Sequence, residues 1–401
     1  MCRNLIVITI TAVLFGLTFG VYDLVLPLWL KTNGINYMQM GWIFAVSNGL
    51  MILLPIVTGR LADHFGRKRF FATALACCGA ACAATPMTVN VAGQTILRVL
   101  QRAATGVYES LQGVLIFETN RAKFLLSIRL ARGFEFTCNA LGAFLVWALI
   151  RGQTGADKLA SPMYVACGLL LVSFVLVVGW LREPESVPAN NLANRRLNPF
   201  GLPPVLILLA VFNFVFSLGL SISHSQMMVL FFYDKFNLAE HQVAWVSMAH
   251  RVSLGLPMML AAFWVTRPNK WLFAVTVALE GLLVSATVFP TGVVGAVAVW
   301  FLHDPIGAAI WFPMNAWYMQ HYARPDRRAA DVATVMAMNT LGMAIGPLIA
   351  GQLAEYAGPV PSPLSGAIDL PFFASGLIVV ISAALICFLP RAPRDAAPRP
   401  G

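Results

Sequence analysis

Charged residues are scarce in this 401-residue sequence. Only 11% of the residues are Asp, Glu, Lys or Arg, whereas 59% are hydrophobic and the mean hydropathy is +0.75. So few charged side chains cannot cover the surface of a soluble globular protein of this length. A water-soluble protein is therefore excluded. The sequence also lacks a nucleotide-binding loop, a soluble domain and a catalytic motif. We therefore expect neither enzyme activity nor a cofactor.

Cysteines placed for an extracytoplasmic disulfide are also lacking. Six of the seven cysteines lie in apolar segments, and Cys2 lies at the N-terminus. Cys77, Cys78 and Cys82 are close enough along the chain to suggest metal ligands. Their neighbours are Ala and Gly, which is typical of a membrane helix face that packs closely against another helix. We interpret the three as small packing residues and expect no metal site.

Long apolar runs, in contrast, are abundant. About 20 apolar residues span the hydrocarbon core of a bilayer. Twelve segments meet this requirement, at residues 5–30, 38–58, 70–89, 93–117, 128–150, 161–181, 203–232, 241–265, 271–289, 292–317, 331–354 and 369–389. The first run has no convincing cleavage site, so we expect it to be retained as a helix. The predicted fold class is an all-α integral membrane protein with twelve transmembrane helices.

The basic residues indicate the orientation in the membrane. The loops on the side of residues 59–69, together with both termini, hold nineteen of the 27 Lys and Arg residues. The opposite loops hold four, namely Lys31, Arg151, Lys158 and Lys235. The positive-inside rule therefore predicts cytoplasmic termini in a membrane of the bacterial inner-membrane type. The net charge of +10 is a topology signal, and we expect no nucleic-acid binding.

A charge-dense loop separates the second and third apolar runs. It reads GRLADHFGRKR from residue 59 to residue 69, and its glycines allow a tight turn between helices. The loop resembles the signature that the major facilitator superfamily carries between helices 2 and 3. The matching residues are Gly59, Asp63, Gly66, Arg67 and Lys68. The resemblance implies two six-helix bundles that transport a solute by alternating access.

A weak internal repeat indicates the same organisation. Asn139-Ala-Leu-Gly142 recurs as Asn339-Thr-Leu-Gly342, and Gln39-Met-Gly-Trp42 recurs as Gln242-Val-Ala-Trp245. We expect an N-terminal bundle over 1–182, a polar cytoplasmic linker over 183–202 and a C-terminal bundle over 203–401. In this superfamily the halves are parallel repeats, and the substrate binds near the midplane between them.

The resemblance implies a gating role for the charge-dense loop. Asp63 can pair with Arg67 and face the N-terminus of helix 11, whose dipole favours a nearby anion. Such contacts exist only while the cytoplasmic side is closed, so they stabilise the outward-open state. Glu118, at the end of the fourth predicted helix, resembles the acidic position that the family couples to this network. The alternative is an ordinary basic cytoplasmic loop.

Ionisable residues inside the apolar runs are the functional candidates, because an unpaired charge in hydrocarbon is costly. Asp23 and Arg98 both fall in the outer halves of their segments and can pair. The strings that contain them, DLVLP and LRVLQ, resemble the helix 1 and helix 4 motifs of twelve-helix drug/proton antiporters. This resemblance implies that Asp23 couples transport to protons and that Arg98 tunes it. A structural salt bridge is the alternative.

A second ionisable group, closer to the cytoplasm, comprises Glu109, Arg132 and Glu135. One arginine cannot neutralise two glutamates at short range, so we expect one carboxyl to hold a proton and to act as a titratable switch. The alternative is that Arg132 extends to the membrane interface.

Polar residues of the second half complete the predicted site. Arg251 and Asp304 are expected to pair, and His303 can titrate in the physiological range. For His303 and His224, hydrogen-bonded packing is the alternative. Metal binding by His303 with Asp304 is disfavoured because adjacent helical residues point about 100° apart. The predicted substrate cavity comprises Tyr22, Tyr108, Gln112, Asn139, Asn213, Gln226, Arg251, His303, Asp304, Trp311 and Asn315, for which packing is again the alternative.

One departure from the antiporter pattern bears on the direction of transport. The fifth predicted helix reads GFEFTCNALGAF and has no proline, where drug antiporters carry a Gly-Pro-Gly motif. Import therefore stays open, although export is favoured. We expect a monomeric, proton-coupled transporter of a small amphipathic organic solute. The alternatives are an importer of a nutrient or siderophore-like solute, and a non-transporting receptor, assembly protein or lipid translocator.

Overall fold

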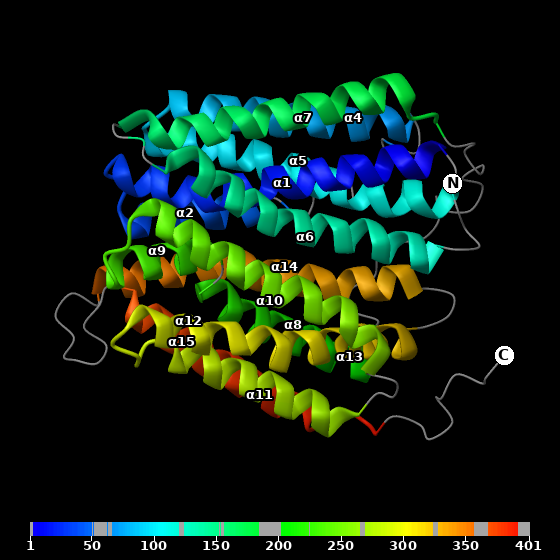
Figure 1. Ribbon diagram of the computed structural model, residues 1–401. Helices are drawn as coiled ribbons and strands as arrows, with labels where there is room; N and C mark the ends of the chain where they lie inside the picture. Colours follow the sequence, from blue (N-terminus) through cyan, green and yellow to red (C-terminus); the bar gives the residue numbers. More distant parts are fainter. Residues whose placement is uncertain are drawn as a thin grey trace. The chain divides into compact units, whose positions relative to one another are not determined.

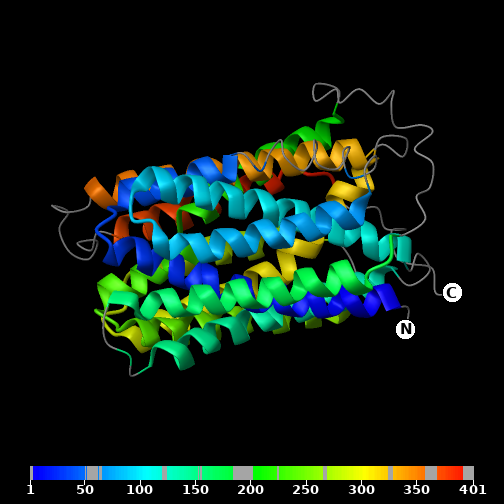
Figure 2. The same cartoon turned by 90° about the horizontal axis from the view of Figure 1, so that it is seen from above.

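The computed structural model describes residues 3–49, 51, 62, 66–119, 124–151, 153, 156–183, 202–223, 225–264, 269–323, 328–356 and 368–391. Within these ranges the chain is almost entirely helical, and no β-strand occurs in them. The helices of each compact unit run alongside one another (Figure 1, Figure 2). The predicted all-α class is confirmed.

The chain forms two compact units, residues 1–195 with 228–252 and residues 196–227 with 253–401. The helices of the first unit are α1 (Arg3–Thr32), α2 (Tyr37–Gly49), α4 (Arg67–Ala84), η2 (Thr85–Met87), α5 (Val91–Thr119), α6 (Phe124–Ile150), η4 (Ala156–Leu159) and α7 (Ala160–Trp180). Those of the second are α8 (Pro204–Ser223), α11 (Lys270–Ala286), α12 (Val293–His303), the π-helical η6 (Asp304–Ala308), α13 (Ala309–Tyr322), α14 (Arg328–Tyr356) and α15 (Asp369–Ile386).

Two further helices are divided between the units. α9 (Ser225–Lys235) and α10 (Glu240–Trp264) contribute their residues 228–235 and 240–252 to the first unit. Each of the twelve predicted segments overlaps at least one of these helices. The boundaries predicted at 182 and 203 for the two bundles stay a prediction.

The same packing pattern occurs in both units. In the first unit, α1 packs against α6 and α7, and α4 packs against α5 and α7. In the second unit, α8 packs against α14 and α15, and α11 packs against α15, α12 and α13. The equivalence of α1 with α8 and of α6 with α14 agrees with the internal repeat read from the sequence.

Glycines determine how closely the repeated helices approach. A Cβ atom on Gly142 of α6 would overlap the carbonyl oxygen of Leu17 and lie 2.9 Å from the Cα of Gly20 on α1. A Cβ atom on Gly342 of α14 would overlap the carbonyl oxygen of Phe214 and lie 2.7 Å from the amide nitrogen of Leu218 on α8. Backbone contact of this kind is typical of small residues at membrane helix interfaces. The repeated Asn-x-Leu-Gly string therefore marks equivalent points of closest helix approach.

The second repeated string begins a helix in both places. At the start of α2, the Asn36 amide donates to Gln39 Oε1 (3.0 Å) and the Gln39 amide donates to Asn36 Oδ1 (2.8 Å). This reciprocal arrangement is a capping box. At the start of α10, the Ala239 amide donates to Gln242 Oε1 (2.9 Å). The repeated glutamine thus satisfies a free amide at equivalent helix starts.

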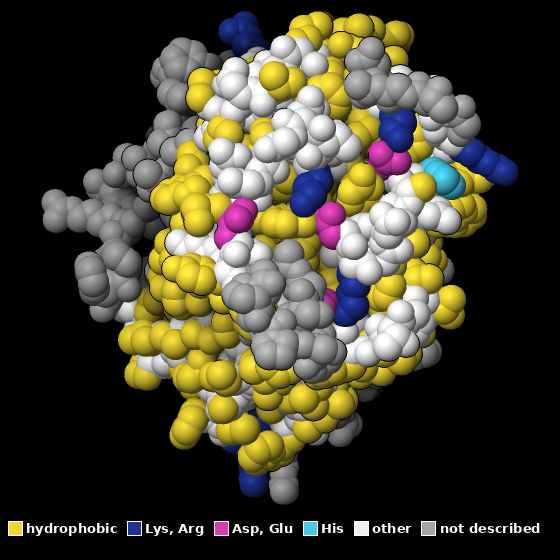
Figure 3. All heavy atoms as spheres, turned by 90° about the vertical axis from the view of Figure 1, so that its left-hand side faces the viewer, with side chains coloured by type: hydrophobic (Ala, Val, Ile, Leu, Met, Phe, Trp, Pro, Cys, Tyr) yellow, Lys and Arg dark blue, Asp and Glu magenta, His cyan; other side chains and the backbone are white. Residues whose placement is uncertain are grey.

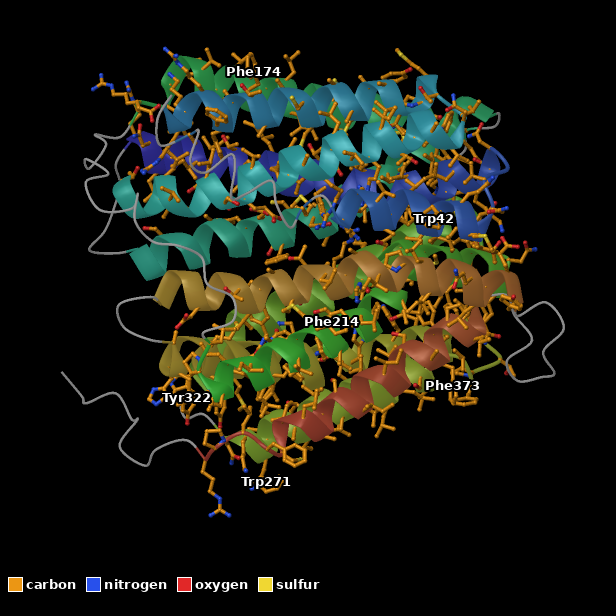
Figure 4. The ribbon with its side chains drawn as sticks, turned by 180° about the vertical axis from the view of Figure 1, so that it is seen from behind. Trp42, Phe174, Phe214, Trp271, Tyr322 and Phe373 are labelled. Carbon is orange, nitrogen blue, oxygen red and sulfur yellow. The ribbon has the colours of Figure 1, made fainter. Side chains whose placement is uncertain are left out.

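The outer surfaces of the helices suit a bilayer. Eight helical stretches in the described part of the chain are long and apolar enough to cross a membrane. Large apolar side chains are exposed on them, including Leu171 and Val175 on α7 and Ile381 on α15. Phe174 also lies on α7, and Trp271 and Tyr322 lie toward one end of the second unit's helices (Figure 4). Such placement of Trp and Tyr is typical of membrane–water interfaces.

We predict that Gly142→Ala destabilises the first unit by about 1–3 kcal/mol, because the added methyl group overpacks the α1–α6 interface. Thermal unfolding of the purified protein in detergent measures the effect. Gly168→Ala on α7 is the matched control, because no heavy atom lies within 4 Å of its added Cβ. Equal melting temperatures for the two variants would contradict the proposed backbone contact.

Candidate polar sites in the two units

Asp23 and Arg98 form a buried ion pair in the first unit. Asp23 lies on α1 and Arg98 on α5, and the distance from Arg98 Nη2 to Asp23 Oδ1 is 3.3 Å. Both residues are only 2% exposed. The Arg98 guanidinium carbon also lies 5.7 Å from the ring centroids of Tyr22 and Phe44. The pair is therefore shielded by aromatic rings, where an electrostatic interaction is stronger than in water.

A chain of polar contacts extends from this pair along α5. Arg98 Nη1 donates to Gln101 Oε1 (2.8 Å), and Gln101 Nε2 donates to Thr105 Oγ1 (3.1 Å). One turn from Arg98, Arg102 Nε donates to Asn48 Oδ1 on α2 (3.1 Å). The polar contacts therefore continue from the predicted coupling pair to Thr105, and the Arg102–Asn48 bond separately joins α5 to α2.

Further along α5, three of the predicted residues meet. Gln112 Nε2 donates to Tyr108 Oη (3.0 Å) and to Glu135 Oε2 on α6 (3.1 Å). Tyr108 stacks on Phe15 with ring centroids 3.8 Å apart. Glu135 is buried, whereas the side chain of Glu109 is exposed. The Arg132 side chain lies outside the described residues, so its expected place between the two glutamates stays a prediction.

Several buried polar atoms of the first unit have no hydrogen-bond partner among the described residues. They include Thr11 Oγ1, Arg98 Nε, Gln112 Oε1, Asn139 Oδ1 and Arg251 Nη1. Buried polar groups are normally hydrogen-bonded, so each such atom requires an explanation. The set offers both donors and acceptors from α1, α5, α6 and α10. A polar solute or water that reaches the interior of this unit would satisfy them.

Arg251 is the least compensated of these groups. It is 8% exposed, and its Nε donates to Ser247 Oγ one turn earlier on α10 (3.2 Å). The predicted partner, Asp304, belongs to the second unit. That pairing therefore stays a prediction.

The start of α4 shows how part of the charge-dense loop is held. Gly66 adopts φ +98°, a conformation that favours glycine. Immediately after it, the Arg67 and Lys68 amides donate to the two carboxylate oxygens of Glu183 at 2.7 and 2.9 Å. An anion at a helix N-terminus is stabilised by the free amides and by the helix dipole. Glu183, which lies just after α7, therefore caps the N-terminus of α4.

The sequence interpretation missed this role of Glu183 and placed it in the linker. Two features of the sequence could have indicated this role. An acidic residue lies just after the sixth apolar run, and the first turn of α4, with its free amides, has no acidic residue of its own. Gly59, Asp63 and the Glu118 side chain lie outside the described residues. The expected gating contacts of Asp63 and Glu118 therefore stay predictions.

A separate polar cluster occurs in the second unit. His303 Nε2 lies 3.4 Å from Asp304 Oδ1, and Ser253 Oγ donates to Asp304 Oδ2 (3.0 Å). His303 and Asp304 are both buried at the junction of α12 and η6. Trp311 Nε1 donates to Glu280, a carboxylate on α11 that the sequence interpretation did not single out. Glu280 was visible only as the one acidic residue inside the run 271–289.

Two predicted cavity residues of the second unit bind each other. Asn315 Nδ2 donates to Asn213 Oδ1 (2.8 Å), and Asn213 Nδ2 donates to Asn315 Oδ1 (3.2 Å). The pair links α8 with α13 and leaves little free hydrogen-bonding capacity, which favours the packing interpretation for these two amides. His224 and the Gln226 side chain lie outside the described residues.

Comparison with known proteins identifies the family. The model of the Major Facilitator Superfamily matches residues 8–234 and 214–401, which together include nearly the whole chain. The chain belongs to the major facilitator superfamily. The family resemblance predicted from residues 59–69 is confirmed, and the fold is that of secondary transporters embedded in membranes.

Solved structures of major facilitator proteins share the fold at low sequence identity. A mutant of the nucleoside transporter NupG matches with a TM-score of 0.80 and 14% identity over 96% of this chain and 99% of that chain. A bacterial homolog of the human lysosomal transporter Spinster gives 0.76 and 13% over 96% of both chains. A D-xylose–proton symporter gives 0.73 and 16% over 96% and 98%. No curated protein sequence matches the chain.

We predict a strong energetic coupling between Asp23 and Arg98. Replacing either residue by Ala leaves a buried charge without its partner and should lower the unfolding free energy by about 3–5 kcal/mol. The double variant should lose clearly less than the sum of the two. A double-mutant cycle in mixed micelles measures this coupling.

Lys158 and Glu240 supply the control cycle. Their side chains are 26% and 13% exposed and lie 2.9 Å apart, so solvent weakens their interaction to about 1 kcal/mol or less. Additive effects of Asp23→Ala and Arg98→Ala would show that the buried pair contributes no mutual stabilisation.

Proposed function

We propose that this major facilitator protein is a proton-coupled transporter of a small amphipathic organic solute, with export favoured over import. The observation that carries proton coupling is the Asp23–Arg98 pair. Its carboxylate is buried and contacts one guanidinium. Protonation of Asp23 would remove the attraction that holds Arg98. Arg98 would then be available to another acceptor.

The surroundings of Arg98 support a competition between proton and solute. Its Nε already has no hydrogen-bond partner among the described residues, and Nη1 is held by the neutral amide of Gln101. A solute that accepts a hydrogen bond from Arg98 would therefore gain most when Asp23 is protonated. Differential binding of this kind shifts the balance between transport states. The Gln112–Glu135 contact and the free Asn139 oxygen add polar groups for the same solute.

Contacts at the end of the first unit where α1 ends and α2 begins support movement during transport. Figure 3 views the molecule from this side, and acidic and basic side chains are visible among the hydrophobic ones. Lys31 Nζ lies 3.7 Å from Asp234 Oδ2, which also accepts a hydrogen bond from Tyr37. Trp147 and Trp245 pack edge to face at 5.4 Å. Partly exposed ion pairs contribute little each, so such contacts can open and re-form.

Import of a nutrient is the second candidate. The absence of proline from α6 departs from the antiporter pattern. The fold neighbours also include a D-xylose–proton symporter, which shows that this fold serves proton symport in another protein. The same Asp23–Arg98 pair would serve coupling in either direction.

We predict that both termini are cytoplasmic. A reporter that is active only in the cytoplasm should give signal when fused after Gly401. The same reporter inserted after Gly34, in the turn between α1 and α2, should be inactive because that turn lies on the opposite side. Activity at Gly34 together with silence at Gly401 would reverse the proposed orientation.

We predict that Asp23→Asn separates binding from coupling. The substitution keeps the shape but removes the titration, so gradient-driven transport should fall by about 100-fold, as expected when a positioned proton-transfer group is lost. Solute binding and counterflow exchange should persist. Thermal stabilisation by a panel of drugs, sugars, siderophores and organic acids first selects the solute. Transport is then measured in proteoliposomes with an imposed pH gradient.

Glu355→Gln is the control for this experiment, because Glu355 is an exposed carboxyl at the end of α14. It should transport like the parent protein. Proton-driven transport by Asp23→Asn at the parental rate would instead assign coupling to Glu109, Glu135 and Arg132.

A further inference from the structure

Glu280 is a buried carboxyl group that the proposed function does not use. It lies on α11, ten residues after the helix start at Lys270, and is only 2% exposed. Its one hydrogen bond among the described residues comes from the indole N–H of Trp311. No Lys or Arg within the described ranges forms a salt bridge with it. An ionised carboxylate without a counter-ion would be energetically costly in the apolar interior of a membrane protein.

The space around the carboxyl is shaped by η6. A Cβ atom on Gly307 would lie 2.5 Å from Glu280 Oε2 and 2.7 Å from Glu280 Cβ. Only glycine at position 307 therefore leaves room for this side chain. Trp311, which donates to Glu280, is itself held by Phe216 at a centroid distance of 4.4 Å. The Gly307 backbone and the aromatic rings thus fix the position of the carboxyl.

Among the described residues, no Lys or Arg of the elements packed against α11 provides a counter-ion for Glu280. α11 packs against α12, η6, α13 and α15. The titratable residues of these elements are His303, Asp304, Tyr318, His321, Tyr322 and Asp369, and none of them is a Lys or Arg. Of these, His303 and Asp304 lie at the junction of α12 with η6, whose Gly307 contacts Glu280. Asp304 begins η6, so this element adds a second acidic residue beside Glu280 and no positive charge. His303 is paired with Asp304 at 3.4 Å, so a protonated His303 neutralises Asp304 rather than Glu280.

We propose that Glu280 is a proton-binding site of the second unit, separate from the Asp23–Arg98 pair of the first. With a proton on Glu280 the cluster of Glu280, Asp304 and protonated His303 is neutral. When the proton leaves to water, one negative charge remains next to Asp304. The protonation state of Glu280 therefore responds to any event that changes the His303–Asp304 pair.

The chemistry of the surroundings favours a proton over a metal cation. Na⁺ and similar hard cations require several oxygen ligands, whereas the described groups around the Glu280 carboxyl are an indole N–H, a glycine and a second, paired carboxylate. An indole N–H points its positive end at the carboxyl and would repel a cation there. A protonated carboxyl accepts this N–H without conflict.

Infrared spectroscopy of the full-length protein in lipid tests the proposal without any solute. The parent protein should show the C=O band of a buried carboxylic acid at neutral pH. Glu280→Gln should lose this band, because its amide keeps the shape and cannot be protonated in this range. Glu355→Gln, which alters an exposed carboxyl, should keep it. A parental band that persists unchanged in Glu280→Gln would overturn the proposal.

A second variant tests the contact itself if Glu280→Gln does not fold. Trp311→Phe removes the hydrogen bond to the carboxyl but leaves Glu280 in place, so the C=O band should move to higher frequency. A purely structural carboxylate would give no such shift, and that result would contradict the proposal. Exchange of choline for Na⁺ at constant pH should leave the band unchanged. Loss of the band with Na⁺ would instead assign the site to a metal cation.

The role of this proton in transport rests on the proposed function, whereas its presence does not. The infrared result stands even if no panel solute is transported. If the band is confirmed, Glu280→Gln should also reduce the pH dependence of transport in proteoliposomes while solute binding persists. Absence of the band with intact proton-coupled transport would reject Glu280 alone and leave the Asp23–Arg98 proposal in place.

Discussion

A charge in the apolar interior of a membrane protein must be neutralised close to where it lies, because hydrocarbon offers no solvent to stabilise it. Each of the polar sites in this chain is a different solution to that constraint. Asp23 is neutralised by Arg98 across two helices. Glu135 is solvated by the amide of Gln112. Among the described residues Glu280 has an indole N–H and a neighbouring acid but no Lys or Arg partner, and we propose a bound proton as its solution.

Close helix packing makes these solutions possible. Asp23 lies three residues beyond Gly20, whose missing side chain lets α1 contact the backbone of α6 at Asn139. The same kind of contact joins α8 with α14 through Gly342 and Gly346. Helices held by backbone contact cannot slide without losing it, so the polar groups they carry keep fixed distances. The glycines therefore position the charges as well as stabilising the bundle.

The sequence predicted the helices and the family well because both depend on local signals. Apolar runs and one charged loop were sufficient, and the Asp23–Arg98 pair followed from two ionisable residues at similar depths. Contacts that depend on three-dimensional packing were not accessible in this way. Glu183 reaches the start of α4 from more than 110 residues away, and Glu280 on α11 meets Trp311 on α13, 31 residues further along the chain. Nothing in the spacing of these residues encodes either contact.

The π-helical segment η6 also has a geometric consequence for the residues that follow it. A π turn holds one residue more than an α turn, so it changes which side of the helix the next residues face. Conversion of Asp304–Ala308 to α geometry would rotate α13 about its axis by about 100°, the angle of one α-helical residue. Trp311 and Asn315 would then turn away from Glu280 and Asn213 together. A single change of hydrogen-bond register can therefore change the direction that an entire helix face points.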